Sequence, residues 1–356
     1  MSNKHEALDI PTLAGMLTFI SANIAREEWV KVLMGIKSEF GEGGKSVAME
    51  WSATASNYSL KGFNSTWKSI KAGGGVTIAS LVLEAVNNGY KFTPISKDEK
   101  KRLNAEHKAR AKQRKREAEQ EAIKREKGYQ TAKTRANEII ERSGYANSVH
   151  PYYFKKGISE DVKGLPPVFM NGTALIIPVM RFNSGFKPNN WNQYDTKVMF
   201  EVSSLQFIEQ DGSKLFLKGG QLKGGFYPVR FDGYIHEIII CEGYATAVTL
   251  AVHYAQLSEV VCAFNAGNLK HVAREFKKRY PAANIVIAAD NDRTTELKTG
   301  VNVGIQKAIE ACKAVDGELW VPEFKEDEQG SDWNDLYQLN KVKQTIMDEN
   351  LGGDHE

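Results

Sequence analysis

Apolar residues near the start of the chain recur at the spacing of amphipathic helices. Leu13 and Leu17, for example, lie four residues apart and therefore share one helical face. Thr77 precedes another apolar run of helical spacing, and we expect it to cap a helix that follows a loop at Gly73–Gly75. This pattern predicts a small helical domain over residues 8–93.

The following segment, residues 96–142, consists almost entirely of good helix formers and contains no proline. It predicts one long, exposed helix that links the flanking domains. Residues 97–127 hold 13 Lys or Arg against 7 Asp or Glu, although the net charge of the whole chain is only +3. A solvated spacer is the preferred interpretation, but the local basic excess also favours a nucleic-acid backbone, through Arg110, Lys112, Arg114, Lys115 and Arg116.

The pattern changes twice beyond Tyr145. Residues 145–232 contain short β-rich runs, such as Ala174–Val179, separated by Gly and Asn, and they indicate a mixed, strand-rich subdomain. Over residues 235–340, apolar strands alternate with helical stretches, which favours a parallel sheet flanked by helices. We therefore expect a multidomain α+β and α/β protein that ends in a tail over residues 341–356.

Composition narrows the class of protein. A chain of 356 residues with 42% apolar content is long enough for two or three globular domains. No stretch approaches the roughly 18 consecutive apolar residues of a membrane span, and the N-terminus lacks the layout of a secretory signal, so we expect a cytoplasmic protein that does not enter membranes. Its cysteines, Cys241, Cys262 and Cys312, lie far apart in apolar segments and predict neither a disulfide framework nor a zinc site.

Acidic residues follow two of the expected parallel strands. Glu242 and Gly243 come directly after one apolar strand, and Asp290 and Asp292 follow another. Open α/β sheets bind ligands at the carboxyl ends of their strands, where carboxylates from neighbouring strands converge. Hard oxygen ligands suit Mg²⁺ or Mn²⁺. Gly243 is expected to let the chain turn straight after Glu242, so that the next helix N-terminus can face a phosphate.

Each of these motifs also has an ordinary structural explanation. Asp-x-Asp is common in turns and helix caps, and an isolated Glu-Gly carries little information. The two together, in this order and separated by a strand and a helix, favour phosphoryl-transfer chemistry. Asp332 follows the final strand, where it either caps the helix around Leu336 or reaches the same metal site as a third acidic loop.

These motifs resemble the Toprim domain of phage and plasmid primases related to DnaG-type enzymes. The resemblance covers residues 235–340 and rests on IIICEGYATAVTL, AFNAGNL, IAADND and SDWNDL. It implies acid or base work for Glu242, a divalent metal held by the Asp290 and Asp292 pair with help from Asp332, and a nucleotide contact at Asn268. Thr246 departs from the pattern, because DnaG-type enzymes usually carry an Asp there.

The β-rich segment resembles the subdomain that precedes Toprim in such primases. The similarity lies in HPYYFKKGIS, LIIPV and LQFIEQDGSKLFLKGG. It implies that basic residues face template and incoming nucleotide, and the Gly-rich setting of Lys214, Lys218 and Lys223 suits phosphate binding. A solvated hairpin is the alternative interpretation of these lysines.

The N-terminal segment resembles the small helical domain found beside primase catalytic domains in viral and plasmid replication proteins. EEWVKVLMGIKSEFGEGGKS and WKSIKAGGGVTIASLVLEA carry this similarity. The end of the first motif imitates a Walker A loop, but Glu39 stands where that loop needs Gly. No helicase motor is therefore predicted, and unwinding would need a partner protein.

The sequence thus predicts a DNA primase of a phage or plasmid, acting in a bacterial host cell. It would join NTPs into short RNA primers on single-stranded DNA, using Mg²⁺ or Mn²⁺ and no zinc, with a separate replicative helicase as possible partner. A Toprim nuclease would use the same carboxylates for hydrolysis. A noncatalytic replication accessory that binds DNA through residues 97–127 is the third alternative.

Overall fold

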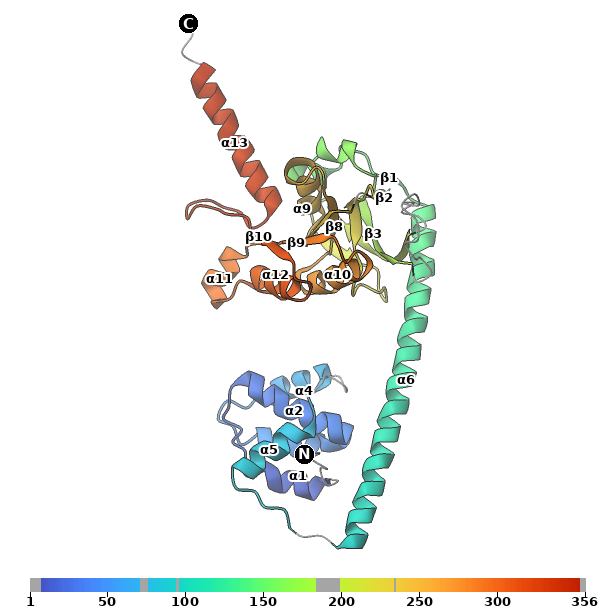
Figure 1. Cartoon of the computed structure of the whole chain (residues 1–356), viewed down its shortest axis with the longest axis vertical. Coiled ribbons are helices and arrows are strands. Elements are labelled where there is room, and N and C mark those ends of the chain that lie inside the picture. Colours follow the sequence, from blue (N-terminus) through green and yellow to red (C-terminus); the bar gives the residue numbers. More distant parts are fainter. Residues whose placement is uncertain (1–7, 71–75, 94–95, 184–198, 234, 353–356) are drawn as a thin grey trace. The chain divides into compact units, whose positions relative to one another are not determined.

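A computed structural model describes residues 8–70, 76–93, 96–183, 199–233 and 235–352 of the chain (Figure 1). It contains two compact units, Met1–Arg125 and Glu126–Glu356, and each has its own apolar core. The expected multidomain architecture of helices, mixed sheet and parallel sheet is confirmed. No helix in the described ranges is both long enough and apolar enough to cross a membrane.

The first unit contains the expected bundle of short helices. Leu13, Leu33 and Trp67 are among its buried core residues. Thr77 caps the last helix of the bundle, as predicted, by accepting a hydrogen bond from the N–H of Ala79; the predicted loop at Gly73–Gly75 lies outside the described residues. The elements are α1 (Ile10–Leu17), α2 (Arg26–Phe40), the 3₁₀ turn Gly41–Gly44, α3 (Lys45–Ser52), α4 (Leu60–Ser69) and α5 (Ile78–Asn87).

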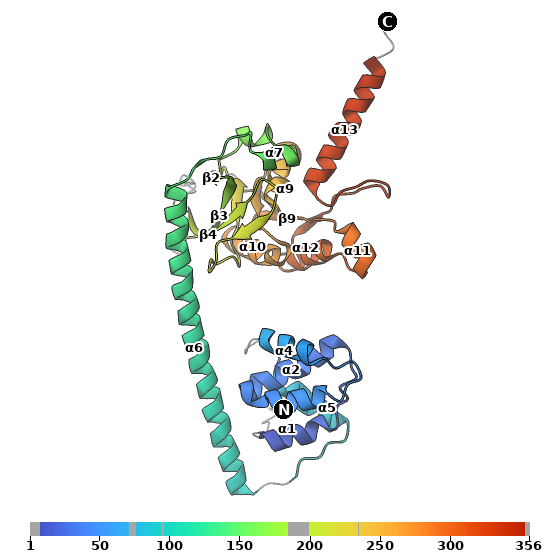
Figure 2. The ribbon, with the colours of Figure 1, turned by 180° about the vertical axis from the view of Figure 1, so that it is seen from behind.

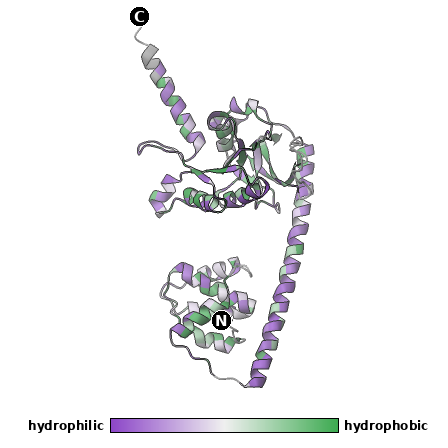
Figure 3. Cartoon of the chain, in the orientation of Figure 1, coloured by the Kyte–Doolittle hydropathy of each residue, from purple (hydrophilic) through white to green (hydrophobic). Residues whose placement is uncertain are grey.

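The predicted long helix is α6, Lys97–Glu141, whose residues are mostly hydrophilic (Figure 3). It is not solvated throughout. Near its start, Leu103 is buried, and near its end Ala132 and Ala136 are buried. Both ends of the helix therefore pack against protein, each within its own unit.

The second unit begins with an antiparallel sheet in the order β1-β2-β3-β4-β5. The last turns of α6 cover one face of this sheet, where Ala136 packs on Ile176, Leu205 and Leu217. A short helix, α7 (Pro151–Lys156), and the 3₁₀ turn Asp161–Gly164 lie between β1 and β2. The strands are β1 (Gly144–Tyr145), β2 (Phe169–Asn171), β3 (Ala174–Phe182), β4 (Phe200–Ile208) and β5 (Lys214–Phe216).

A second sheet, in the order β10-β9-β7-β8-β6, follows. Four of its strands are parallel, as predicted, and β6 pairs with β8 in the antiparallel direction. The strands are β6 (Tyr227–Arg230), β7 (Glu237–Cys241), β8 (Glu259–Cys262), β9 (Asn284–Ala288) and β10 (Glu318–Trp320); the helices are α9 (Tyr244–Thr249), α10 (Ala266–Arg279), α11 (Arg293–Thr299), α12 (Val303–Lys313) and α13 (Trp333–Gly352).

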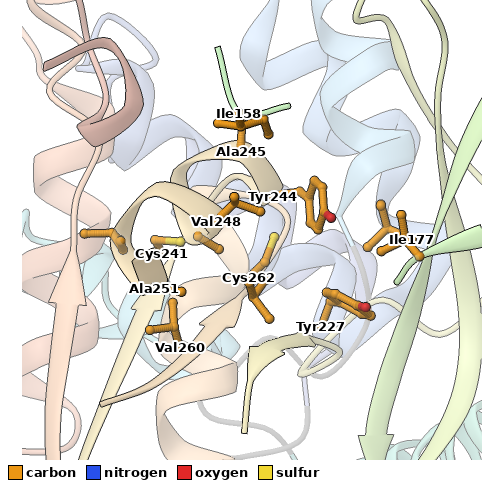
Figure 4. Close-up of a cluster of buried hydrophobic side chains, with 14 of the residues drawn as sticks. Ile158, Ile177, Tyr227, Cys241, Tyr244, Ala245, Val248, Ala251, Val260 and Cys262 are labelled. Atoms are coloured by element: carbon orange, nitrogen blue, oxygen red, sulfur yellow. The ribbon is translucent and has the colours of Figure 1, made fainter. Parts of the chain in front are cut away.

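Helices cover both faces of this sheet (Figure 2). On one face, α9 contributes Tyr244 and Val248 to a core that also holds Cys241 and Cys262 (Figure 4). On the other face, α10 and α12 pack on alternate strand residues through Phe276 and neighbouring apolar side chains. Two buried faces explain why these strands are almost continuously apolar in sequence.

Three local features differ from the sequence-based expectation. The helical stretch after the first parallel strand is not one regular α-helix, because α9 passes into a π turn over Leu250–Tyr254. Gly243 has a φ of −100°, so the chain leaves Glu242 through backbone angles that any residue adopts. Within the expected C-terminal tail, residues 341–352 are instead the second half of α13, because they continue a helix that begins at Trp333; the rest of the tail lies outside the described residues.

Candidate active site

The predicted acidic residues meet at one edge of the parallel sheet. Cys241 of β7 is the register partner of Ala288 of β9, so the next residues of both strands emerge side by side. Glu242 follows the first strand directly, and Asp290 follows the second. The sheet topology therefore brings the two carboxylates together, as their positions at strand ends predicted.

Glu242 is held at the start of the turn into α9. One of its carboxylate oxygens, Oε1, is buried and has no hydrogen-bond partner among the described residues. The backbone N–H of Ala266, at the start of α10, donates to the carboxylate and favours its ionised form. The thiol of Cys262 donates to the Glu242 carbonyl oxygen over 3.2 Å, which fixes the main chain at this position.

The loop after β9 is fixed by contacts with α12. Asn302 accepts a hydrogen bond from the N–H of Asp292 at 3.2 Å, and its amide donates to Asn291 at 2.9 Å. The N–H of Gly304 donates to the Asp292 carboxylate at 3.2 Å. A Cβ atom at Gly304 would stand 2.3 Å from the Asp290 carbonyl oxygen, so only glycine allows this close approach.

Asp332 caps the last helix, which is one of the two roles that the sequence left open, and its carboxylate also faces the acidic edge. Its Oδ1 accepts from the N–H of Asp335 at 2.9 Å and so caps α13. Its Oδ2 lies 3.8 Å from the Nζ of Lys156. The carboxylate is also close enough to Asp290 to raise the pKa of that residue, so it faces the acidic edge.

Burial and charge repulsion raise the pKa values of Glu242 and Asp290. Burial first, and then the charge of Asp292, raises the pKa of Glu242 to about 7. Burial first, and then the charges of Glu242 and Asp332, raises the pKa of Asp290 to about 8. Ionised carboxylates are therefore costly here unless a cation is close by.

The donor set fits a hard divalent cation. Oδ1 of Asp290, like Oε1 of Glu242, is buried without a hydrogen-bond partner in the described part of the chain. Oxygen donors of this kind suit Mg²⁺ or Mn²⁺, which usually keep several water or phosphate ligands. Within the described ranges, no group of three or more His, Cys, Asp or Glu side chains is arranged to hold a metal ion.

The predicted lysines differ in their relation to this site. Lys214, at the start of β5, is near enough to Glu242 and Asp290 for its charge to lower both pKa values. Lys218 and Lys223 are exposed. The pKa of His271 in α10 is lowered, mainly by burial and next by the charge of Lys223.

Asn268 has a structural position. Its side-chain amide donates to the carbonyl oxygens of Gly225 at 2.8 Å and Ala263 at 2.9 Å, and its Oδ1 accepts from the N–H of Gly224 at 2.7 Å. These bonds tie the turn before β6 to α10. Because they occupy the amide with backbone groups, the structure gives no separate support to the nucleotide contact predicted at Asn268.

The basic residues of α6 fall into two groups. Arg110 and Arg114 face the first unit, where their guanidinium groups lie 3.4 and 3.7 Å from the carboxylate of Glu39. Glu39 is only 7% exposed. Lys112, Lys115 and Arg116 are exposed on other faces of the helix. The first two arginines thus hold the helix to the first unit, and the other three lie on the surface.

Three residues with a clear place at this edge were not predicted. Lys156 lies in the quoted motif HPYYFKKGIS, which was a usable signal. Asn302 follows no recognised motif. Arg293, next to Asp292, donates to the carbonyl oxygens of Lys325 at 3.0 Å and Glu328 at 3.2 Å and so holds the loop that leads to Asp332.

Comparison with known families agrees with this geometry. Residues 237–341 match the family model of the Toprim domain. The second unit contains a Toprim domain. Residues 13–85 match the family model named Primase C terminal 2, or PriCT-2, in the helical first unit. Of the three resemblances seen in the sequence, those of the Toprim segment and of the N-terminal helical segment are therefore confirmed, and the Toprim match includes all four acidic residues of the site.

Curated relatives match about a third of the chain. Two proteins named DNA primase TraC, both from Escherichia coli, are 40% and 36% identical over 124 residues. This stretch is 34% of this chain but only 12% and 8% of the two relatives. The chain thus corresponds to a small part of each relative's length.

Two solved structures show a distant likeness. The primase fragment of the bacteriophage T7 primase-helicase protein has a TM-score of 0.37 at 15% identity, over 58% of this chain and 74% of that one. The E. coli primase catalytic core has a TM-score of 0.30 at 14% identity, over 64% and 73%.

Proposed function

We propose that this chain is a DNA primase that joins NTPs into short RNA primers on single-stranded DNA. The observation that carries the proposal is the meeting of Glu242, Asp290, Asp292 and Asp332 at one edge of the Toprim sheet, with Lys214 beside them. The PriCT-2 domain supports a replication role, as do relatives named DNA primase.

In this proposal the protein positions charge around the reacting phosphate. Asp290 and Glu242 would hold Mg²⁺ or Mn²⁺, with Asp292 and Asp332 completing the acidic edge. Such a cation, when bound, neutralises the phosphates of the incoming nucleotide. Asp292 is kept in place by Gly304, and Lys214 adds positive charge beside the phosphate path.

Glu242 also offers a proton acceptor for the attacking 3′-hydroxyl. This role is the alternative to metal binding, because a bound cation would keep the carboxylate ionised and so lower its tendency to accept a proton. Lys218 and Lys223 would hold the template or nucleotide phosphates, with Gly243 and Asn268 shaping the main chain around them. The exposed α6 residues Lys112, Lys115 and Arg116 would add sequence-independent attraction for the template.

A separate replicative helicase would be the partner that opens the duplex. Gly41–Gly44, the segment that imitates a Walker A loop, forms a 3₁₀ turn and not a phosphate-binding loop after a strand. The reaction would take place in the cytoplasm of a bacterial host, where template and NTPs are available.

The test is a priming reaction with single-stranded DNA, labelled NTPs and Mg²⁺ or Mn²⁺. We expect Asp290→Ala and Glu242→Gln to abolish primer synthesis while the variants keep the wild-type circular dichroism spectrum. Asp327→Asn, an exposed acidic residue in the loop before α13, is the matched control and should keep full synthesis.

The same reaction separates the alternatives. A primase lengthens products from labelled NTPs, whereas a Toprim nuclease would shorten a labelled DNA strand. A noncatalytic accessory would neither lengthen nor shorten nucleic acid. Its binding to DNA would be unchanged by Asp290→Ala and by Glu242→Gln. Full synthesis by purified Asp290→Ala protein would contradict the proposed function.

A further inference from the structure

Lys156 brings a positive charge to the acidic edge from outside the Toprim domain. It is the last residue of α7, and its Nζ lies 3.8 Å from Oδ2 of Asp332 and 3.8 Å from Oδ1 of Asp335. The side chains of Lys156 and Asp332 are 29% and 16% exposed. This ion pair is therefore shielded from solvent more than a surface pair is. Its charges are screened less, so they can affect the other charged groups of the acidic edge.

The main chain around Lys156 is held independently of its charge. The buried amide of Asn334 donates to the Lys156 carbonyl oxygen at 2.9 Å and to the hydroxyl of Thr249 at 2.9 Å. Gly157, at a φ of +66°, ends α7, and its carbonyl oxygen accepts from Gln338 at 3.3 Å. Removing the ammonium group of Lys156 should therefore leave the end of α7 joined to the first turns of α13.

Asp332 is likewise held without Lys156. Its Oδ1 caps α13 through the N–H of Asp335. The loop that precedes it is fixed by the bond from the N–H of Asn291 to the carbonyl oxygen of Ser331, at 2.6 Å. Lys156 thus contributes mainly charge, and the surrounding backbone contributes position.

We propose that Lys156 is a built-in counter-ion of the acidic edge, which competes with the divalent cation for the charge of Asp332. The inference rests on the proposed function, because it assumes that a cation binds at Asp290 and Glu242. A cation near Asp332 meets the ammonium group at short range, and like charges in a shielded site repel. Lys156 therefore weakens cation binding while it stabilises the ion-free protein.

The competing explanation is a purely structural ion pair. In that case loss of Lys156 would lower stability equally with and without the cation. The effect on cation affinity separates the two explanations, because loss of a counter-ion strengthens cation binding, whereas loss of a purely structural ion pair leaves cation binding unchanged.

The experiment is a Mn²⁺ titration of the whole protein, followed by its unfolding temperature. Lys156→Met removes the charge and keeps most of the length of the side chain. Lys155→Met is the matched control, because the neighbouring lysine instead donates to the carbonyl oxygen of Asp211 at 2.6 Å. Lys156→Arg keeps the charge, and Lys156→Gln replaces the methionine variant if that one does not fold.

We expect Lys156→Met to lower the unfolding temperature without Mn²⁺. We also expect it to reduce the half-saturating Mn²⁺ concentration about three- to tenfold relative to wild type and Lys155→Met. Lys156→Arg should behave as wild type. In an Asp332→Asn background, Lys156→Met should no longer change the half-saturating concentration, because the carboxylate through which the two cations compete is gone.

An unchanged or higher half-saturating concentration in Lys156→Met overturns the counter-ion inference. Asp290→Asn distinguishes this failure from failure of the proposed function. If Asp290→Asn abolishes the Mn²⁺ response while Lys156→Met has no effect on it, only the inference about Lys156 is wrong. If Asp290→Asn keeps the full response, the cation site itself is wrong, and the role of Lys156 is overturned with it.

Discussion

At the scale of single residues, the acidic edge is organised for ligand binding at a cost in stability. Glu242 and Asp290 each have a buried carboxylate oxygen without a hydrogen-bond partner among the described residues. Their pKa values are raised because burial and repulsion penalise the charged forms. A folded protein keeps such groups where their function outweighs the stability that they remove.

Asp290→Asn should therefore stabilise the ion-free protein. The amide removes one repelling buried charge, and we expect the free energy of unfolding near pH 8 to rise by about 1 kcal/mol. The same variant should lose the Mn²⁺-dependent rise in unfolding temperature. Denaturant unfolding with and without Mn²⁺ measures both effects, and exposed Asp327→Asn serves as control. A destabilised Asp290→Asn protein would argue against repulsion at this site.

The close approach of Gly304 to the loop after β9 leads to a second prediction. A Cβ atom at this position would lie 2.3 Å from the Asp290 carbonyl oxygen and 3.2 Å from Oδ2 of Asp292. Gly304→Ala should push the loop after β9 aside, cost about 1–3 kcal/mol in unfolding free energy and weaken the Mn²⁺ response. Gly128→Ala is the control, because its Cβ meets open space on α6. Wild-type stability in Gly304→Ala would show that the loop adapts freely.

Sequence reasoning succeeded where chemistry follows from local order along the chain. It placed Glu242, Asp290 and Asp292 at one sheet edge, because parallel strands end on the same side. It did not find the roles of Arg110 and Arg114, since their partner Glu39 lies 71 and 75 residues away along the chain. Pairings over such separations leave no periodic trace in a single sequence.

At the scale of elements, α6 has docked ends and an exposed middle. Residues 115–128 are exposed throughout, whereas Leu103 and Ala136 are buried against protein. The first docked stretch is held by Glu39, which Arg110, Arg114 and His107 approach within 3.4 to 3.7 Å. A composition-based prediction of a solvated spacer therefore describes the middle of the helix only.

Glu39→Ala should release the start of α6 from the bundle. Removing the buried carboxylate leaves two guanidinium groups without their acidic partner, which costs about 3 kcal/mol or more in sites of this kind. Hydrogen exchange of residues 103–114 in the whole protein should accelerate, while residues 132–140 keep their protection. Glu121→Ala, in the exposed middle of α6, should change neither segment. Unchanged exchange in Glu39→Ala would show that the ion pairs do not hold the helix.

The exposed basic residues of α6 lead to a prediction about template binding. Replacing Lys112, Lys115 and Arg116 together by Ala should weaken single-stranded DNA binding and reduce the slope of log affinity against log salt by about 2, because three phosphate contacts are lost. Replacing Lys124, Arg125 and Lys127 removes as much charge from a stretch that also contains several Glu residues, and it should have a smaller effect. Equal salt slopes for the two triple variants would exclude a specific role for the first group.

At the scale of the whole molecule, the two units have separate cores and separate family matches. The first unit holds the PriCT-2 match and the core around Leu33, whereas the second holds the Toprim match and the cores on both faces of its sheet. All four acidic residues, Lys214 and Lys156 belong to the second unit. The chemistry of the cation site should therefore not require the first unit.

A fragment of residues 126–356 tests this independence. Ala132 and Ala136, which cover the antiparallel sheet, remain in the fragment, so its core is complete and it should unfold cooperatively. Its half-saturating Mn²⁺ concentration should match that of the whole chain within about twofold, because every charge that acts on Glu242 and Asp290 is retained. Template affinity should fall, since the exposed lysines and arginine of the first half of α6 are gone. A fragment that folds but no longer responds to Mn²⁺ would show that the cation site needs residues of the first unit. That result would contradict the assignment of the cation site to the second unit alone.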